Sequence, residues 1–545
     1  MSRLLNALCL TLLILPVSAG DSVDVLGLPK ERYSDWPVRT SSRGSVAIAE
    51  KLADNEVLVP LLNRDELPVA LIASDEIAAL LPSAKLTRPE ADTSLVEWIS
   101  KQLDSSKAIC WISDSRDDIE VLLKIRKPLQ SFVAEGGTVV LIGPHAVAAG
   151  SNYSARDDLR RWKLGAGLIS DAAICSSTAS DSDTFLKALT RRVGIQLGQT
   201  GLLYLRARKF AVVGDGQATF RLAKGSWLNA REQVLRPQKS RGQDPNEFIV
   251  DLTEWRRDAI ERTLEPFPPA KPPTPHVKSG TLYIVGGGGM PKGLMEEIVK
   301  AAGGKDAEMV YVPCAEQEEI PRSSLIDLWK RMGVKSAVVL HTKDRVKADT
   351  DEEFYKPLKT ATGIWFGGGR QWNFADSYYG TTTHRLMKEV LARGGVIGGS
   401  SAGASIQARY LARATPIQNF NIMAPGYERG GLGFIGGVAI DQHFSQRGRQ
   451  KDMTKLVNRY PQMLGIGLDE ATAIVVNGSE AKVVGRGRAH FYDRNVPVVE
   501  GEPDYVALPA GSKYELATRR VLHDATPPPK EEAAEESADT ESVEL

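Results

Sequence analysis

The segment at 399–403, Gly-Ser-Ser-Ala-Gly, has the residue types and spacing of a nucleophile elbow. It follows the apolar run at 395–397 and opens a helix-like segment at 405–411. In such an elbow, a sharp turn from strand to helix strains the middle residue and projects its side chain above the sheet, so its neighbours must be small. The middle residue is Ser401, which predicts a serine hydrolase. The alternative is a glycine- and serine-rich turn that only leads into a buried helix.

A serine hydroxyl needs a base to accept its proton, and the base needs a third group to orient it. His443 is the best candidate for the base because it directly follows an apolar strand and lies well downstream of Ser401. The carboxylate is expected from Asp469 or Glu470, which follow the apolar run at 464–468. Metal ligation by His443 is disfavoured, since no second histidine or cysteine stands at ligand spacing. An ordinary solvated pair at a strand end is the alternative explanation of the two carboxylates.

The oxyanion that develops during acyl transfer needs preorganised hydrogen-bond donors. The amide of Ala402, directly after the nucleophile, is expected to supply one of them. Gly368 and Gly369, in a glycine turn after another strand, can expose a second amide. Arg447 and Arg449 alternate with a glycine and could clamp a substrate carboxylate through bidentate hydrogen bonds. A solvated basic loop is the alternative for these two arginines.

Four consecutive glycines at 286–289 follow a further strand and suggest a nucleotide-binding loop. The dinucleotide fingerprint fails there because Pro291 occupies its last glycine position, and no lysine is placed as in a phosphate loop. We therefore predict a tight turn that lets the backbone approach the site.

These motifs need a scaffold, and residues 279–525 predict a doubly wound, mostly parallel α/β sheet. Parallel sheets place their sites at the carboxyl ends of strands, which is where the motifs lie. The expected strands are Leu282–Val285, Met309–Val312, Ala337–Leu340, Gly363–Phe366, Val396–Ile397, Val438–Ile440 and Ala473–Val476. The expected helices are Lys292–Ala302, Ser323–Met332 and Thr381–Arg393.

The chain is 545 residues long, more than one hydrophobic core usually supports, so at least two domains are expected. A proline-rich linker at 265–278 separates the predicted catalytic domain from residues 22–264. That N-terminal half predicts an α/β domain with a β-rich stretch at 201–252 and no assignable chemistry. Residues 526–545 are acidic, which predicts a disordered tail. Within the N-terminal half we expect strands at 108–112 and 138–142 with a helix at 118–134 between them.

Residues 1–19 have the features of a secretion signal: a basic start at Arg3, an apolar stretch at 4–17 and small residues before the expected cleavage site. We therefore expect a protein exported to the periplasm or the extracellular space. An uncleaved membrane anchor is the alternative; no later run is long and apolar enough to span a bilayer.

Composition limits the partners and the cysteine chemistry. Lys plus Arg and Asp plus Glu both total 68, so no net charge favours nucleic acid or an anionic membrane surface. Outside the signal, Cys110, Cys175 and Cys314 form an odd set without metal-type spacing. We expect three buried thiols rather than a Cys110–Cys175 disulfide.

Taken together, five separated motifs resemble those of cyanophycinase in order and spacing along roughly residues 279–498. The resemblance implies a class I glutamine-amidotransferase-like α/β fold, shared with dipeptidase E, with serine replacing that fold's usual cysteine. It implies cleavage of β-aspartyl-arginine dipeptides from cyanophycin, a polyaspartate backbone that carries arginines on isopeptide bonds, without metal or cofactor. By motif position, Ser401 would be the nucleophile, His443 the base and Glu470 its orienting acid. The motifs lie at 284–288, 367–371, 399–404, 441–449 and 465–470.

The resemblance also implies a substrate pocket, and the chain departs from the family in two places. The family's Gly-Gly-Asp-Gln turn is here Gly-Gly-Arg-Gln, so either Gln371 is displaced or Arg370 takes the place of the acidic residue. A further pocket arginine of the family is here Asp452. Reversing a desolvated charge in such a pocket should alter specificity by several kcal/mol. The implied substrate-binding residues are Arg370, Gln371, Asp441, Gln442, Arg447 and Arg449.

The leading hypothesis is an exported serine exopeptidase that acts on cyanophycin or related β-aspartyl peptides through an acyl-enzyme. Its expected partner is a peptide substrate, and a homodimer is left open. The alternatives are a dipeptidase E-like enzyme for aspartyl or isoaspartyl peptides, and a non-catalytic binding protein that retains the fold.

Overall fold

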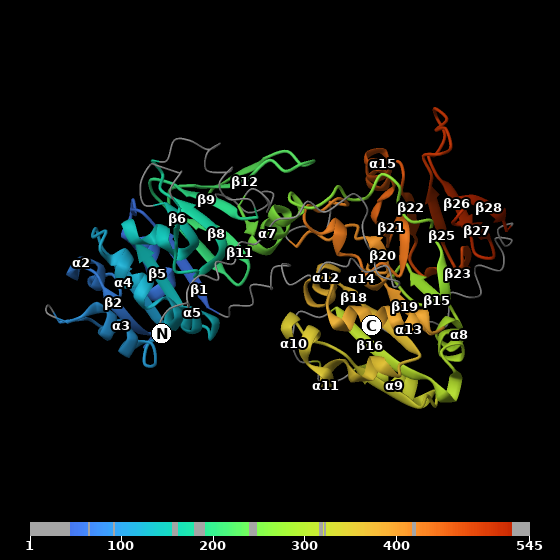
Figure 1. Cartoon of the computed structure of the whole chain (residues 1–545), viewed down its shortest axis with the longest axis horizontal. Helices are drawn as coiled ribbons and strands as arrows, with labels where there is room; N and C mark the ends of the chain where they lie inside the picture. The colour runs from blue at the N-terminus through green and yellow to red at the C-terminus, as the bar shows by residue number, and fades with distance from the viewer. Residues whose placement is uncertain are drawn as a thin grey trace, which may run out of the picture.

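A computed structural model describes residues 44–525 except 64–65, 91–92, 155–161, 179–190, 239–247, 315–319, 321–322 and 417–420. Two bodies lie side by side along the long axis of the molecule (Figure 1). No helix within the described part of the chain is both long and apolar enough to cross a bilayer. The predicted signal at 1–19 and the predicted tail at 526–545 lie outside the described residues.

The N-terminal half contains two sheets, with helices packed on them. In the first sheet, five strands run parallel and three further strands continue the sheet antiparallel. Its order is β14 (Val250–Asp251), β11 (Lys209–Val213), β10 (Leu202–Arg206), β1 (Ser45–Ala49), β5 (Thr138–Ile142), β4 (Ala108–Ile112), β2 (Pro68–Ile72) and β3 (Lys85–Thr87). The second has the order β13 (Arg231–Leu235), β12 (Ala218–Leu222), β9 (Val193–Leu197), β8 (Ile169–Cys175), β6 (Gly150–Ser154) and β7 (Lys163–Leu164).

The helices of this half are short. The segment expected as one helix at 118–134 forms two helices, because the backbone leaves the helical conformation at Ile125. The helices are α1 (Val59–Leu62), α2 (Asp75–Ala79), α3 (Leu95–Gln102), α4 (Asp118–Lys124), α5 (Arg126–Ala134) and α7 (Leu252–Glu261). Cys110, Cys175 and Cys314 are all buried free thiols in this structure.

The C-terminal half also contains two sheets. In the larger one, five neighbouring strands, β17 to β15 in spatial order, are parallel, and β23 pairs with β15 antiparallel. Its order is β17 (Ser336–Val339), β16 (Glu308–Cys314), β18 (Gly363–Gly369), β19 (Val396–Ser400), β15 (Val277–Val285), β23 (Thr472–Gly478), β24 (Glu480–Gly485), β27 (Lys513–Glu515) and β28 (Arg520–His523). The smaller has the order β20 (Ala408–Tyr410), β21 (Ile435–Asp441), β22 (Leu464–Leu468), β25 (Arg488–Tyr492) and β26 (Val506–Pro509).

The mixed α/β fold is therefore confirmed, but the expectation of one doubly wound sheet is wrong at Val438–Ile440. This segment belongs to β21, in the smaller sheet. After β19, the chain turns through the four-residue helix α14 (Ala402–Ser405) into β20, which begins the second sheet. Apolar residues of β21 and β22 join the same core as one face of the larger sheet, so burial on that face stabilises a separate layer.

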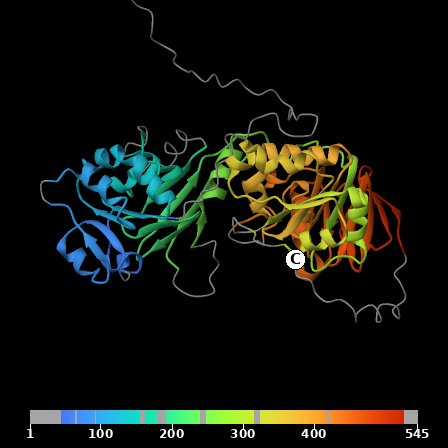
Figure 2. The ribbon, with the colours of Figure 1, turned by 90° about the horizontal axis from the view of Figure 1, so that it is seen from below.

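Helices cover both faces of the larger sheet (Figures 1 and 2). On one face, α8 (Leu294–Ala301) and α9 (Ser324–Arg331) share a core with β15, β16 and β18. On the other, α12 (Trp372–Tyr378), α13 (Thr382–Ala392) and α14 share the core that includes the smaller sheet. The remaining helices are α10 (Arg345–Thr350), α11 (Glu352–Tyr355) and α15 (Gln450–Arg459).

Buried charges connect the two halves. Asp376 on α12 accepts hydrogen bonds from Arg208 Nη1 at 2.7 Å and from Tyr427 Oη at 3.0 Å, and it pairs with Arg257 Nη2 of α7 at 2.8 Å. Arg208 also pairs with Asp251 in the N-terminal half. Because these groups are buried, each charge depends on its partners across the contact.

The proline-rich segment predicted as a linker packs on the C-terminal half. Phe267 is buried and stacks on Tyr410, with ring centroids 6.0 Å apart. The guanidinium group of Arg429 lies 4.8 Å from the centre of the Phe267 ring. Strand β15 begins at Val277, inside the predicted linker. This segment is therefore anchored to the C-terminal half rather than standing free.

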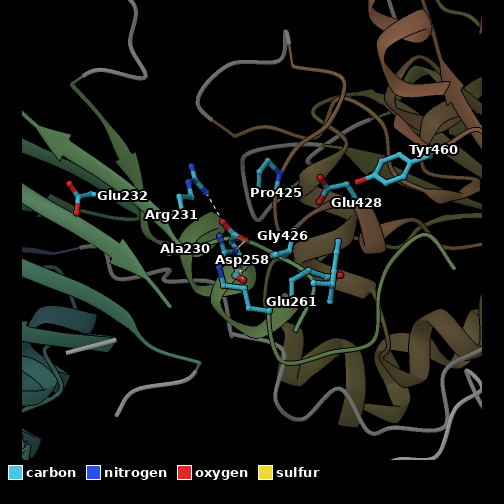
Figure 3. A pocket seen from close by; sticks show the side chains of 12 residues that line it. Ala230, Arg231, Glu232, Asp258, Glu261, Pro425, Gly426, Glu428 and Tyr460 are labelled. Atoms are coloured by element: carbon cyan, nitrogen blue, oxygen red, sulfur yellow. Dashed lines mark hydrogen bonds and ion pairs between the residues drawn. The ribbon is translucent and has the colours of Figure 1, made fainter. Parts of the chain in front are cut away.

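A cavity of about 370 Å³ opens between the halves beside α7 (Figure 3). The N-terminal half contributes Arg231 and Asp258 to its wall, and the C-terminal half contributes Glu428 and Tyr460. The motif residues of the predicted active site are not among the residues that line it. The candidate site therefore lies elsewhere, at the strand ends of the C-terminal half.

Candidate active site

Ser401 lies in a strained turn between β19 and α14. Its φ of 55° and ψ of −113° place it in a conformation that side-chain-bearing residues rarely adopt. The backbone is tightly packed around it: a Cβ on Gly399 would stand 2.3 Å from the carbonyl oxygen of Gly403. The small residues of the motif are therefore required by close backbone contacts, as a nucleophile elbow demands.

The structure brings Ser401, His443 and Glu470 together in one hydrogen-bonded chain. His443 Nε2 lies 2.9 Å from Ser401 Oγ, and His443 Nδ1 lies 2.6 Å from Glu470 Oε1. A carboxylate on Nδ1 favours the tautomer with the proton on Nδ1, which leaves Nε2 free to accept the serine proton. The arrangement can therefore generate a serine nucleophile.

The two neighbouring carboxylates that the sequence left open have different partners. Glu470 is the one that faces His443, with a side chain that is 35% exposed. Asp469 turns the other way and is bound by His490 Nε2 at 3.2 Å and by the amide of Ser445 at 3.1 Å. Burial favours a raised pKa for Asp469, but these hydrogen bonds and the charge of His490 outweigh burial and lower the pKa to about 2.

The end of β15 and the glycine turn at 286–289 that follows it support all three segments of this chain of hydrogen bonds. The amide of Ser401 donates to the carbonyl oxygen of residue 285 at 3.0 Å. The amide of His443 donates to that of residue 286 at 2.8 Å, and the amide of Ala471 donates to that of residue 287 at 2.7 Å. The predicted tight turn near the site is confirmed. Its backbone holds the nucleophile, the base and the residue after the acid at fixed spacing.

Gly287 offers a direct test of this support. A Cβ there would stand 2.4 Å from Cε1 of the His443 ring, at a φ of +94°. We expect Gly287→Ala to displace the imidazole and to slow modification of Ser401 by a serine-directed phosphonate probe by roughly 10²-fold. Gly293→Ala is the matched control, because Gly293 also has a positive φ, +75°, but no atom lies within 4 Å of the added Cβ. Equal labelling rates for the two variants would show that the turn does not position the base.

The base has a perturbed protonation equilibrium. Burial lowers the pKa of His443 below its ordinary value of 6.5; the Glu470 hydrogen bond raises it, and the charges of Arg447 and Arg449 lower it. The base must be neutral to accept a proton, so its competence is lost as pH falls through this lowered pKa. We expect kcat/KM to be constant through neutral pH and to fall with a midpoint below 6.5. A pH–rate profile with its acid midpoint above that value would contradict the assignment of His443.

The predicted oxyanion donors flank the nucleophile. Ala402 is buried at the first position of α14, directly after Ser401. A Cβ on Gly368 would stand 3.5 Å from the Cβ of Ser401, so the turn after β18 passes beside the nucleophile. Cys314 Sγ donates to the carbonyl of Arg370 at 2.6 Å and fixes the end of this turn beyond Gly369. Donation by these amides to a substrate stays a prediction.

The predicted substrate-binding residues divide into a buried and an exposed group. Gln371 is buried, and its Nε2 donates to the carbonyls of residues 412 and 413 at 3.1 and 2.6 Å. Asp441 and Arg449 are buried and paired at 3.0 Å, and Arg449 Nη1 donates to the Gln442 carbonyl at 2.6 Å. Substrate binding by these buried residues, Gln371, Asp441, Gln442 and Arg449, stays a prediction. Asp441 and Arg449 are paired with each other, so to bind a substrate they would have to exchange this partner for it.

Arg370 and Arg447 are exposed and provide accessible positive charge beside the site. Arg370 follows the turn that passes Ser401, and its guanidinium group lies 5.6 Å from the centre of the Trp372 ring. The amide of Arg447 donates to the His443 carbonyl at 3.1 Å, so this loop folds back beside the base. These two side chains are suited to a substrate that carries a free carboxylate.

Two residues of the site were not found from the sequence. Gln446 Oε1 accepts the amide of Glu470 at 3.0 Å and fixes the backbone of the acid. Arg413 lies buried behind the site and pairs with Asp441 and Asp452. Arg413 belongs to no recognisable local pattern, and Gln446 lies within the 441–449 motif without a role that the motif assigns. The partners of both residues lie far away in the chain.

Residues 282–484 match the family model described as "Peptidase family S51". Over this segment the chain is a serine-type peptidase that is similar to the cyanophycinase-like peptidases of family S51. The matched residues contain the nucleophile elbow, the base and the acid, and they leave out the whole N-terminal half.

Curated relatives also match part of this chain. The cyanophycinase of Geminocystis herdmanii is 29% identical over 210 residues, which are 37% of this chain and 75% of that protein. The cyanophycinase of Synechococcus elongatus is 28% identical over 257 residues, 43% of this chain and 78% of that protein. The cyanophycinase of Trichormus variabilis is 27% identical over 268 residues, 44% of this chain and 88% of that protein.

Solved structures of peptidases also align with this chain. One is a peptidase from an acI-B1 Actinobacterium, with 24% identity, a TM-score of 0.33, and coverage of 44% of this chain and 97% of that chain. Another is a putative peptidase E protein from Listeria monocytogenes, with 18% identity, a TM-score of 0.28, and coverage of 38% of this chain and 98% of that chain.

Proposed function

We propose that the protein is an exported serine exopeptidase that degrades cyanophycin or related β-aspartyl peptides to β-Asp-Arg-type dipeptides. The observation that carries the proposal is the 2.9 Å contact between Ser401 Oγ and His443 Nε2 within a strained elbow. Relatives named cyanophycinase, at 27% to 29% identity, support the substrate class. The exposed guanidinium groups of Arg370 and Arg447 suit the free α-carboxylate of a C-terminal β-aspartyl unit.

The proposed reaction passes through an acyl-enzyme. Ser401 Oγ attacks the scissile carbonyl carbon while its proton moves to His443 Nε2, and Glu470 stabilises the imidazolium that forms. The amide of Ala402 and an amide of the Gly368–Gly369 turn stabilise the oxyanion. The imidazolium then protonates the leaving nitrogen, the C–N bond breaks, and an ester to Ser401 remains. Water, deprotonated by His443, hydrolyses this ester and regenerates the serine.

Purified protein incubated with cyanophycin and with matched α- and β-aspartyl dipeptides tests this proposal. We expect dipeptides of the β-Asp-Arg type, identified by mass spectrometry, and no product from the α-linked set. Turnover of α-linked peptides alone would favour a dipeptidase E-like activity instead. No turnover of any substrate, together with no reaction of Ser401 with the phosphonate probe, would favour the non-catalytic binding protein.

Export is part of the proposal and rests on the sequence of residues 1–19 alone. Expression of the full chain followed by N-terminal sequencing of the mature protein tests it. We expect a new N-terminus at Gly20. A protein that keeps its first methionine and stays in the cytoplasm would contradict export without affecting the proposed chemistry.

A further inference from the structure

Arg413 is a buried arginine behind the candidate site that contacts three of the segments around it. Its side chain is only 2% exposed, and it lies in irregular structure after β20 with a φ of 57°. An arginine is costly to bury without partners, so its contacts indicate what it stabilises.

The first contact is with Asp441, the last residue of β21, which leads directly into the loop that carries the base (the base loop). Arg413 Nε lies 3.2 and 3.1 Å from the two carboxylate oxygens of Asp441, and its Nη2 lies 2.8 Å from Oδ2. Asp441 is fully buried and also binds Arg449 Nη1 at 3.0 Å. Arg449 in turn donates to the carbonyl of Gln442 at 2.6 Å. This carbonyl belongs to the residue directly before His443, so the chain of contacts ends at the backbone of the base.

The second contact is with the turn that passes the nucleophile. Gln371 Nε2 donates to the carbonyl of Arg413 at 2.6 Å and to that of Ala412 at 3.1 Å. Gln371 lies two residues after Gly369, at the end of the turn that passes Ser401. The backbone at 412–413 therefore holds the predicted oxyanion turn, while the Arg413 side chain holds the base loop.

The third contact is with α15. Arg413 Nη2 lies 3.0 Å from Asp452 Oδ2, and Asp452 is partly exposed, with 31% of its side chain accessible. One guanidinium group thus pairs with two carboxylates, one on the base loop and one on the helix that follows it. A planar guanidinium with five donors can serve both at once, whereas a lysine ammonium is a single point charge.

We propose that Arg413 is a positioning residue that sets the base loop and the oxyanion turn relative to each other. It contributes the positive charge that keeps Asp441, and through Arg449 the backbone next to His443, in place. The inference rests on the proposed function, because it assigns a role within that same site. Arg413 acts through these groups and touches no reacting atom.

The rate at which a serine-directed phosphonate probe modifies Ser401 tests the inference, because this rate depends on the base and not on the natural substrate. We expect Arg413→Met to lower the rate by roughly 10²-fold and Arg413→Lys to lower it less. In the double variant Arg413→Met/Asp452→Arg we expect recovery of at least about tenfold. Asp441 Oδ2 and Asp452 Oδ2 share Arg413 Nη2, at 2.8 and 3.0 Å, so a guanidinium carried on residue 452 can reach Asp441.

Arg494→Met is the matched control, since Arg494 is a largely buried arginine of the same half that pairs with Asp504. Its labelling rate should equal that of the unaltered protein. Thermal unfolding shows which variants are folded. If Arg413→Met is not folded, the labelling rate of the double variant is compared with that of Arg413→Lys instead. Labelling of the Arg413 variants at the rate of the control, or no recovery in the double variant, would overturn the inference. Absence of labelling in the unaltered protein would instead contradict the proposed function.

Discussion

Ser401→Ala is expected to abolish hydrolysis, with a loss in kcat of roughly 10⁶-fold, as for removal of the nucleophile from a Ser-His-acid triad. The physical reason is that alanine has no hydroxyl from which His443 can take a proton at the 2.9 Å contact. The fold should be unaffected, because the change removes one oxygen and keeps the backbone of the elbow. Product formation from cyanophycin, followed by mass spectrometry, is the measurement.

Ser400→Ala provides the control for this experiment. Ser400 is the neighbouring serine, which ends β19 and cannot be the centre of the Gly-x-Ser-x-Gly pattern. Its removal should leave the rate within about twofold, since a half-buried hydroxyl outside the Ser401–His443–Glu470 chain of hydrogen bonds contributes little. Peptide mapping after reaction with the phosphonate probe should locate the label on Ser401. A label on Ser400, or undiminished hydrolysis by Ser401→Ala, would reject the nucleophile assignment.

Asp376→Asn is expected to destabilise the contact between the two halves by about 3–5 kcal/mol. Asp376 is 1% exposed and is bound by Arg208 and Arg257 of the N-terminal half and by Tyr427. Removing its charge leaves two buried guanidinium groups with less compensation, and desolvated cations are costly. We expect a lower midpoint in thermal unfolding and faster proteolytic cleavage of the chain at the contact between the halves.

The matched control is Glu353→Gln on α11, which also removes one carboxylate from an ion pair. Its partner is Lys356, and both side chains are largely exposed, at 80% and 64%. Exposed pairs contribute about 0–1 kcal/mol, so this variant should unfold like the unaltered protein. Equal unfolding midpoints for the two variants would mean that the buried charges do not hold the halves together.

Local backbone constraints explain how much of the candidate site could be predicted from the sequence. The elbow needs Gly399 and Gly403 within a few residues of Ser401, so a short pattern is sufficient to locate it. The same holds for the turn at 286–289, whose glycines follow directly from the close approach of the backbone to His443. For the elbow, the residues that explain the geometry are neighbours in the chain, whereas His443, which explains the turn, is distant from it in the sequence.

The arrangement of the strands was harder to predict from the sequence. Strands β15, β16 and β18 were expected near their observed positions, because each is a short apolar segment that the larger sheet buries. The apolar character of residues 438–440 predicts a buried strand equally well, but it does not say which sheet buries them. Pairing is decided by the shape of the common core, and β21 pairs with β20 and β22 in the second sheet.

The sequence by itself located the elbow around Ser401, since an elbow depends on residue types at short, fixed spacing, and it predicted His443 as the base. Only the tertiary structure decided that Glu470 faces His443 while Asp469 binds His490. It also decided that Arg413 pairs with Asp441, and that Arg208 and Arg257 of the N-terminal half pair with Asp376 of the C-terminal half. The physical reason is that a buried charge pairs with a group that folding brings within hydrogen-bond distance. Closeness in the folded structure bears no relation to separation along the chain.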